Sequence, residues 1–115
     1  MLDTEQKRLA VLVGRAIARQ RACAGLTQED VAERLQVGNE AVSRIERGVV
    51  IPNIARLFEL AEIFGCEAAE LLTESSARPD DQAARISGLL TPLEPADRHL
   101  VMQLVERLTE RLVKA

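Results

Sequence analysis

The feature that most constrains the fold is a short stretch from Thr27 to Gly48, which contains two helical patterns separated by a tight turn. The hydroxyl of Thr27 can cap the first helix by accepting a hydrogen bond from an amide of its first turn. Asp30, three residues later, is close to a capping box, although that motif normally has Glu or Gln there. We therefore expect one helix over residues 27–35 and a second from residue 38 or 39 to residue 48.

The second of these helices has a polar face that a helix serving only to pack would not need. Asparagine can bond the edge of adenine, arginine can bond guanine, glutamate can accept from cytosine, and serine can bond bases or phosphate. The residues on this face are Asn39, Glu40, Ser43, Arg44 and Arg47. The pattern favours a helix that enters the major groove of DNA, and the alternative is the solvated face of an ordinary helical hairpin.

From about residue 8 to residue 72 the chain resembles the helix-turn-helix family of the lambdoid-phage repressors and Cro proteins, the XRE family. The motifs that carry the resemblance are RxxxGLTQxxVAxxL, xVGNxAVSRIERG and PNIARLFELAEIFG, in that order. Together they cover somewhat over half of the chain. The resemblance implies an all-α fold with a five-helix, repressor-like domain that binds double-stranded DNA.

The resemblance also implies roles for individual residues. The residues expected to contact bases are Gln28, Asn39, Glu40, Ser43 and Arg44. The residues expected to contact phosphates are Thr27, Gly38, Arg47, Asn53 and Arg56. In the family the residue at the place of Gln28 also braces the first residue of the recognition helix. An ion pair between Arg21 and Glu46 is expected to tie the first helix to the third.

The chain departs from the family pattern in three places, one of which is Glu40, where Gln is more common in the family. Gly38 stands where the family often has Thr or Ser, which removes a side-chain phosphate contact but leaves the backbone N–H. Val49 and Val50 replace a more polar loop, so contacts from them should be apolar or absent.

Helical patterns continue along the whole chain. The further helices are expected at residues 4–24, 54–64, 67–72, 81–90 and 95–113. Residues 73–80 are poor in apolar side chains and read as a linker. We therefore expect a DNA-binding domain over residues 1–72, a linker over 73–80, and a C-terminal extension of about two helices over 81–115.

The last expected helix has an apolar stripe that is too broad to be left in water. The stripe contains Leu100, Val101, Leu104, Val105, Leu108 and Leu112. We favour a dimerisation helix, because helix-turn-helix proteins commonly bind two half-sites related by a two-fold axis. The alternative is that this helix folds back over its own first domain.

The formal net charge of −3 counts against a nucleic-acid-binding role, since such domains are often strongly basic. The charge is unevenly distributed, because seven arginines and five acids lie between Gly14 and Arg56. The candidate DNA-binding surface is therefore mildly basic. We expect modest non-specific affinity and a strong dependence on base contacts and dimer geometry.

Cys23 and Cys66 fit no zinc spacing, and each ends a predicted helix among apolar neighbours. We expect two small buried hydrophobic residues in a reducing compartment, and the alternative is a redox sensor that forms a disulfide. His99 stands alone and is expected to be a solvated helical residue. We find no catalytic constellation, no metal site and no cofactor motif, and so expect no enzyme.

No segment approaches the roughly 20 apolar residues needed to cross a bilayer, and the N-terminus lacks the apolar run of a signal peptide. We expect a cytoplasmic transcriptional regulator, a repressor that binds a two-fold symmetric operator as a homodimer. Two alternatives remain open. One is an antitoxin whose C-terminal helices bind a partner protein, and the other is a protein-interaction module that has lost DNA binding.

Overall fold

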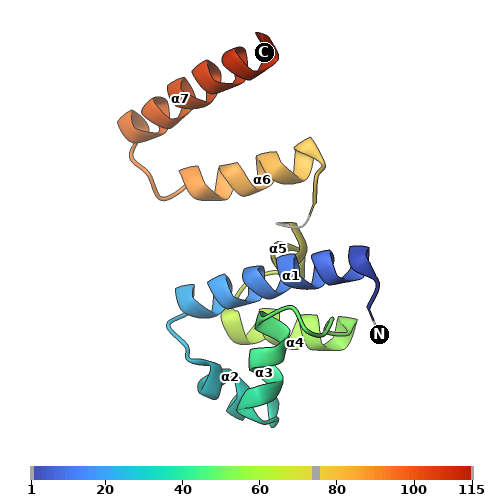
Figure 1. Cartoon of the computed structure of the whole chain (residues 1–115). Helices are drawn as coiled ribbons and strands as arrows, with labels where there is room; N and C mark the ends of the chain where they lie inside the picture. Colours follow the sequence, from blue (N-terminus) through green and yellow to red (C-terminus); the bar gives the residue numbers. More distant parts are fainter. Residues whose placement is uncertain (1, 74–75, 115) are drawn as a thin grey trace. The chain divides into compact units, whose positions relative to one another are not determined.

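The computed structural model describes residues 2–73 and 76–114, and these residues form helices joined by loops and turns (Figure 1). The predicted all-α fold, with five helices followed by a helical extension, is confirmed. The helices are α1 Thr4–Cys23, α2 Gln28–Leu35, α3 Asn39–Glu46, α4 Ile54–Phe64, α5 Ala68–Thr73, α6 Pro79–Leu90 and α7 Pro95–Lys114.

The chain divides into two compact units, residues 1–78 and residues 79–115. The first contains α1 to α5 and the second contains α6 and α7. Of the predicted linker 73–80, residues 74 and 75 lie outside the described part of the chain. Helix α6 begins two residues earlier than expected, at Pro79, which suits the first turn of a helix because proline has no N–H to leave unpaired.

The first two helices begin with capping boxes, in which a side chain and a backbone amide three residues apart bond each other reciprocally. At α1, Gln6 N donates to Asp3 Oδ1 at 2.8 Å, and Asp3 N donates to the Gln6 side chain at 3.1 Å. At α2, Asp30 N donates to Thr27 Oγ1 at 3.0 Å, and Thr27 N donates to Asp30 Oδ2 at 2.9 Å. Aspartate therefore completes the box at α2 in place of the usual glutamate.

The cap of α2 predicts a pH-dependent contribution to stability. The hydrogen bond from the Thr27 amide, with a smaller contribution from its side chain, lowers the pKa of Asp30 below its ordinary value. A carboxyl whose folded pKa is depressed stabilises the fold above its unfolded pKa of about 4, and this contribution is lost as the pH falls through the folded value. Asp30→Asn should therefore lower the denaturation midpoint at pH 7, with the difference from the parent shrinking toward pH 3. A difference that stays constant between these two pH values would contradict this assignment.

The core of the first unit is aliphatic and is made by all five helices. Helix α1 packs against α3, α4 and α5, and α2 packs against α3 and α4 (Figure 1). The buried cluster contains Val13, Ile17, Val31, Ala32, Val42, Ile45, Leu57, Leu60, Ala61 and Leu71. This core holds α3 against the rest of the unit through only two of its residues, Val42 and Ile45.

Helical periodicity predicts that Leu9 and Ala41 face the core, and Cys23 was expected to be buried, but all three residues are exposed. Leu9 is 41% exposed, because the buried side of α1 runs through Ala10, Val13 and Ile17 and leaves Leu9 at its edge. Ala41 stands one helical turn before the buried Ile45 on α3 and is nevertheless exposed. Cys23, the last residue of α1, is also exposed rather than buried.

Cys66 follows α4 and is partly buried. Burial is the largest cause that raises the pKa of its thiol, and the nearby Glu70 adds to it. A raised pKa keeps a thiol protonated and unreactive at neutral pH. For Cys66 the structure therefore fits the packing role better than the redox one.

Two glycines allow the backbone of α1 to touch the end of α3. A Cβ on Gly14 would lie 2.5 Å from the carbonyl oxygen of Ile45, and a Cβ on Gly48 would lie 2.6 Å from the Cα of Val11. Gly48 also has a φ of 76°, which side chains with a Cβ rarely adopt. The end of α3 is thus fixed against α1 by backbone packing.

The second unit is a hairpin of α6 and α7 closed by one arginine. Arg98 Nε donates to the carbonyl of Leu90 at 2.9 Å, and its Nη2 donates to the carbonyl of Thr91 at 2.8 Å. The side chain thereby satisfies carbonyls at the end of α6 that have no partner within the helix. Within the described part of α6 and α7 no residue is fully buried.

Candidate nucleic-acid interface

The two short helices are connected by the tight turn that the sequence predicts. Gln36 ends α2 in a left-handed conformation with φ 60° and ψ 42°. Val37 then packs against the core, and Gly38 begins α3 with an extended conformation. Among residues 2–73 and 76–114, Gln36 is the one non-glycine residue with a positive φ. The left-handed residue reverses the chain within three positions and so sets the angle between α2 and α3.

The carboxylate of Glu46 joins α1, α2 and α3. Arg21 donates from Nε to Glu46 Oε2 at 2.7 Å and from Nη2 to Oε1 at 3.1 Å. Gln28 Nε2 donates to the same Oε1 at 2.9 Å, and Arg21 Nη1 bonds the carbonyl of Leu26 at 2.8 Å. We call Arg21, Gln28 and Glu46 the Glu46 cluster. It fixes the end of α3 to the two helices on which it rests.

The Glu46 cluster is largely shielded from water. Only 6% of the Glu46 side chain and 20% of the Arg21 side chain are exposed. The hydrogen bond to Glu46 is the main cause that raises the pKa of Arg21. A bidentate, charge-assisted pair of this kind is stronger than an exposed ion pair and is also more specific in geometry.

Gln28 lies differently from what the family resemblance implied. It was expected to brace the first residue of the recognition helix, but its amide nitrogen bonds Glu46 near the other end of α3. The Glu46 carboxylate can take this bond because each of its oxygens accepts only one N–H from Arg21, and Oε1 keeps a lone pair for a further N–H. Its expected contact with DNA stays a prediction, and it would use the amide oxygen or a rearranged side chain.

On the outward face of α3, one arginine binds two of the other candidate residues. Arg47 Nη2 donates to Glu40 Oε1 at 2.8 Å, and Arg47 Nε donates to Ser43 Oγ at 3.2 Å. The Glu40 and Arg47 side chains are 74% and 55% exposed, so this pair contributes little to stability. Its importance is electrostatic, because it offsets the one acid on a face that would approach phosphates.

The other two residues of this face are uncommitted. In the described part of the chain, no side-chain hydrogen bond or ion pair holds Asn39 or Arg44. Both are exposed. An amide and a guanidinium on adjacent turns of a short helix can bond base edges without breaking an existing contact.

The candidate phosphate contacts surround this face. Gly38 starts α3 without a side-chain cap, which leaves amides at the helix N-terminus for an anion. Asn53 Oδ1 accepts from the amide of Arg56 at 2.8 Å and so caps α4. Arg56 lies 3.5 Å from Glu59, and it lines a small pocket of about 230 Å³ together with Arg44. The structure therefore brings one expected base contact and one expected phosphate contact close together.

The contacts of Arg47 could be predicted from the sequence, whereas the bond between Gln28 and Glu46 could not. The contacts of Arg47 follow from helical spacing, since Ser43 and Glu40 stand four and seven residues before it on one face. The bond between Gln28 and Glu46 joins residues 18 positions apart and had no local signal. The need for glycine at position 14 also has no local signal, because a glycine inside a helix is unfavourable unless a close neighbour requires it.

Metal sites and membrane-spanning helices are two further features for which the described residues give evidence. Residues 2–73 and 76–114 contain no group of three His, Cys, Asp or Glu side chains that could hold a metal ion. The helices described there also include none with both the length and the apolar character to cross a bilayer.

Comparisons with known proteins agree with this geometry. A family model described as helix-turn-helix matches residues 17–71. The chain is 40% identical over 68 residues to the uncharacterized HTH-type transcriptional regulator y4dJ of Sinorhizobium fredii, covering 59% of this chain and 88% of that protein. It is 27% identical over 86 residues to the cryptic phage CTXphi transcriptional repressor RstR of Vibrio cholerae, covering 75% of this chain and 78% of the relative.

A solved structure is similar as well. The crystal structure of the clp gene regulator ClgR from Corynebacterium glutamicum superposes with a TM-score of 0.57 and 27% sequence identity. The superposition covers 71% of this chain and 89% of that one.

Proposed function

Because the chain belongs to the helix-turn-helix family of transcriptional regulators, we propose that it is a repressor that binds a two-fold symmetric operator as a homodimer. The observation that carries the proposal is the outward face of α3. Asn39 and Arg44 are exposed and uncommitted there, while the Glu46 cluster on the inner side holds the helix in place. Rigid placement of exposed base-reading side chains is what sequence-specific recognition requires.

In the proposed complex, α3 lies in the major groove. Gln28, Asn39, Glu40, Ser43 and Arg44 read bases, and Thr27, Gly38, Arg47, Asn53 and Arg56 contact phosphates. Arg47 can then exchange its bond to Glu40 for a phosphate, which frees Glu40 to accept from the amino group of a cytosine. Base pairs without such a donor would leave Glu40 near phosphates unpaired, so Glu40 would select the site partly by exclusion.

The homodimer is proposed to form through α7. Its leucines Leu100, Leu104, Leu108 and Leu112 are 56–64% exposed in the isolated chain. Burying a leucine contributes on the order of 1–2 kcal/mol, so pairing two such stripes offers enough driving force for association. RstR, the relative described as a repressor, supports the direction of regulation that we propose.

The experiment that tests the proposal is selection of bound sites from a random pool of duplex DNA with the purified full chain. Enrichment of an inverted repeat with half-sites about 10 base pairs apart is the expected result, since this spacing is one turn of DNA. Enrichment of a single half-site would keep the DNA reader and refute the symmetric dimer. Absence of any enriched site at low salt would refute the proposal and favour the protein partner that an antitoxin or interaction module requires.

Substitutions in α7 should separate dimer formation from folding. Leu104→Glu combined with Leu108→Glu should give a monomer in sedimentation equilibrium, because two carboxylates cannot be buried in an apolar seam. The same variant should bind an operator half-site but lose the tight binding of the full site. Ile54→Glu is the matched control for the sedimentation measurement alone, since Ile54 is 73% exposed on α4 outside the proposed seam but lies between the proposed phosphate contacts Asn53 and Arg56. A double variant that stays dimeric would place the dimer interface elsewhere.

A further inference from the structure

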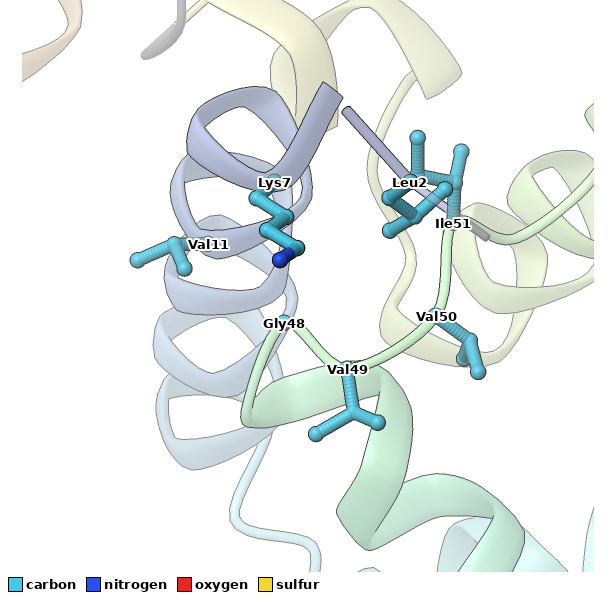
Figure 2. Close-up of a pocket in the computed structure, with 7 residues that line it drawn as sticks. All are labelled: Leu2, Lys7, Val11, Gly48, Val49, Val50 and Ile51. Atoms are coloured by element: carbon cyan, nitrogen blue, oxygen red, sulfur yellow. The ribbon is translucent and has the colours of Figure 1, made fainter. Parts of the chain in front are cut away.

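A pocket of about 650 Å³ lies between the start of α1 and the loop that joins α3 to α4 (Figure 2). Its volume is within the range of about 300–1,000 Å³ that is typical of small-molecule sites. All of its lining residues belong to the first unit. The expected DNA contacts on α3 and α4 leave this pocket unused.

The walls of the pocket are apolar. They include three consecutive branched residues of the loop, Val49, Val50 and Ile51, together with Leu2 near the N-terminal end (Figure 2). Val49 and Ile51 are 47% and 45% exposed. Loops on protein surfaces are usually polar, and contiguous exposed apolar surface often marks a binding site.

One cation stands at this apolar wall. Among the described residues, Lys7 is the one charged residue that lines the pocket, and in Figure 2 its side chain runs along α1 toward Gly48. No ion pair or hydrogen bond engages its ammonium in the part of the chain that the structure describes. An unpaired ammonium beside an apolar wall is complementary to a ligand with an anionic head and a hydrocarbon tail.

We propose that this pocket binds a small aliphatic carboxylate of the medium-chain fatty acid type. The carboxylate pairs with the ammonium of Lys7, and the tail packs against Val49 and Ile51. A neutral apolar ligand would leave Lys7 unused, and a polar anion without a tail would leave the apolar wall exposed to water.

Occupation of the pocket is coupled to the DNA-binding face through Gly48. This residue directly follows Arg47, and its backbone is in contact with α1 at Val11 with no room for a Cβ. A ligand bound between α1 and the loop would therefore contact the segment that connects the end of α3 to the N-cap of α4, and could shift its position. By thermodynamic linkage, the ligand changes operator affinity by the same factor by which the operator changes ligand affinity. This regulatory consequence rests on the proposed DNA-binding function, whereas ligand binding itself does not.

The chain contains two lysines, Lys7 and Lys114, which allows a direct test. The two lysine amines and the α-amine of the chain can be labelled by reductive ¹³C-methylation, which keeps their charge, and the variants Lys7→Met and Lys114→Met assign the two lysine signals. Titration with decanoate, below the concentration at which it self-associates, should shift the Lys7 signal saturably and leave the Lys114 signal in place. Decanol, which has the same tail without the charge, should bind at least ten-fold more weakly.

The decanoate affinities of unlabelled variants can be compared by isothermal titration calorimetry. Lys7→Met should weaken decanoate binding at least ten-fold, and Val49→Asp should do the same by placing a like charge in the pocket. The matched controls are Lys114→Met and Ile54→Asp, which should bind as the parent does. Circular dichroism verifies that each variant is folded.

Three results would overturn the proposal. Equal shifts of both lysine signals would indicate general adsorption on exposed apolar surface. Unchanged decanoate affinity in Lys7→Met would remove the cation from the site. Loss of operator affinity in Lys7→Met, without any decanoate binding by the parent, would assign Lys7 to a DNA phosphate instead. Because ligand binding is measured without DNA, its failure is distinguishable from failure of the proposed function.

Discussion

Arg21→Ala should lower the free energy of unfolding by about 3 kcal/mol, because it leaves the shielded carboxylate of Glu46 without its charged partner. The Glu46 side chain is only 6% exposed and cannot recover full hydration in place. Gln28 would still donate one hydrogen bond, which keeps the loss at the lower end of the range for broken buried pairs. The measurement is urea denaturation followed by circular dichroism.

The control for this prediction is Arg8→Ala. Arg8 and Glu5 form an ion pair on the same helix, 4.0 Å apart, with both side chains 74% exposed. Exposed pairs contribute about 0–1 kcal/mol, so this variant should be nearly as stable as the parent. The double variant Arg21→Met with Glu46→Leu should recover most of the lost stability, since it removes both charges at once. A loss in Arg21→Ala no larger than in Arg8→Ala would contradict a structural role for the cluster.

Arg44→Ala should weaken operator binding by about 1–3 kcal/mol, which corresponds to roughly five-fold to more than a hundred-fold, and should relax preference at one base pair of each half-site. The reason is that Arg44 is exposed, uncommitted and located on the outward face of α3. Removing the Arg44 side chain breaks no hydrogen bond or ion pair within the described part of the chain, so the fold should keep its stability. The measurement is competition binding with a set of operators that carry single substitutions.

The control again uses Arg8→Ala, which removes the same charge away from the proposed DNA face. A general charge effect would weaken binding equally in both variants and equally on all sequences, and it would diminish with added salt. Loss of a base contact, in contrast, weakens binding to the preferred sequence alone. Unchanged base preference in Arg44→Ala would refute the docking of α3 that we propose.

The elements of this fold that could be predicted from the sequence are those fixed by local chemistry. Thr27 and Asn53 mark helix starts because their side chains cap the next amides, and Gly48 and Gly65 mark helix ends because the chain there needs a positive φ. Such signals involve residues within a few positions of each other. They placed helix boundaries to within about two residues.

The elements that escaped prediction depend on which surfaces meet in three dimensions. Periodicity alone gave Leu9 and Ala41 a buried place, but burial also needs a neighbouring helix at that angle. Gly14 is required only because the carbonyl of Ile45 lies against it. Gln28 has an evident donor group, yet its partner Glu46 is known only once α2 and α3 are packed together. At the candidate site, the sequence predicts which residues take part, whereas it does not predict the hydrogen bonds among them.

The division of labour within α3 bears on how new operator preferences arise. Val42, Ile45 and Glu46 anchor the helix, whereas the side chains of Asn39 and Arg44 make no hydrogen bond or ion pair within the described part of the chain. In the docking that we propose, Asn39 and Arg44 can therefore be exchanged while the scaffold keeps its stability, so regulators with this arrangement could diverge in target without passing through unfolded intermediates. The same property makes the helix a suitable site for combinatorial libraries, in which most members should fold and differ only in the DNA they select.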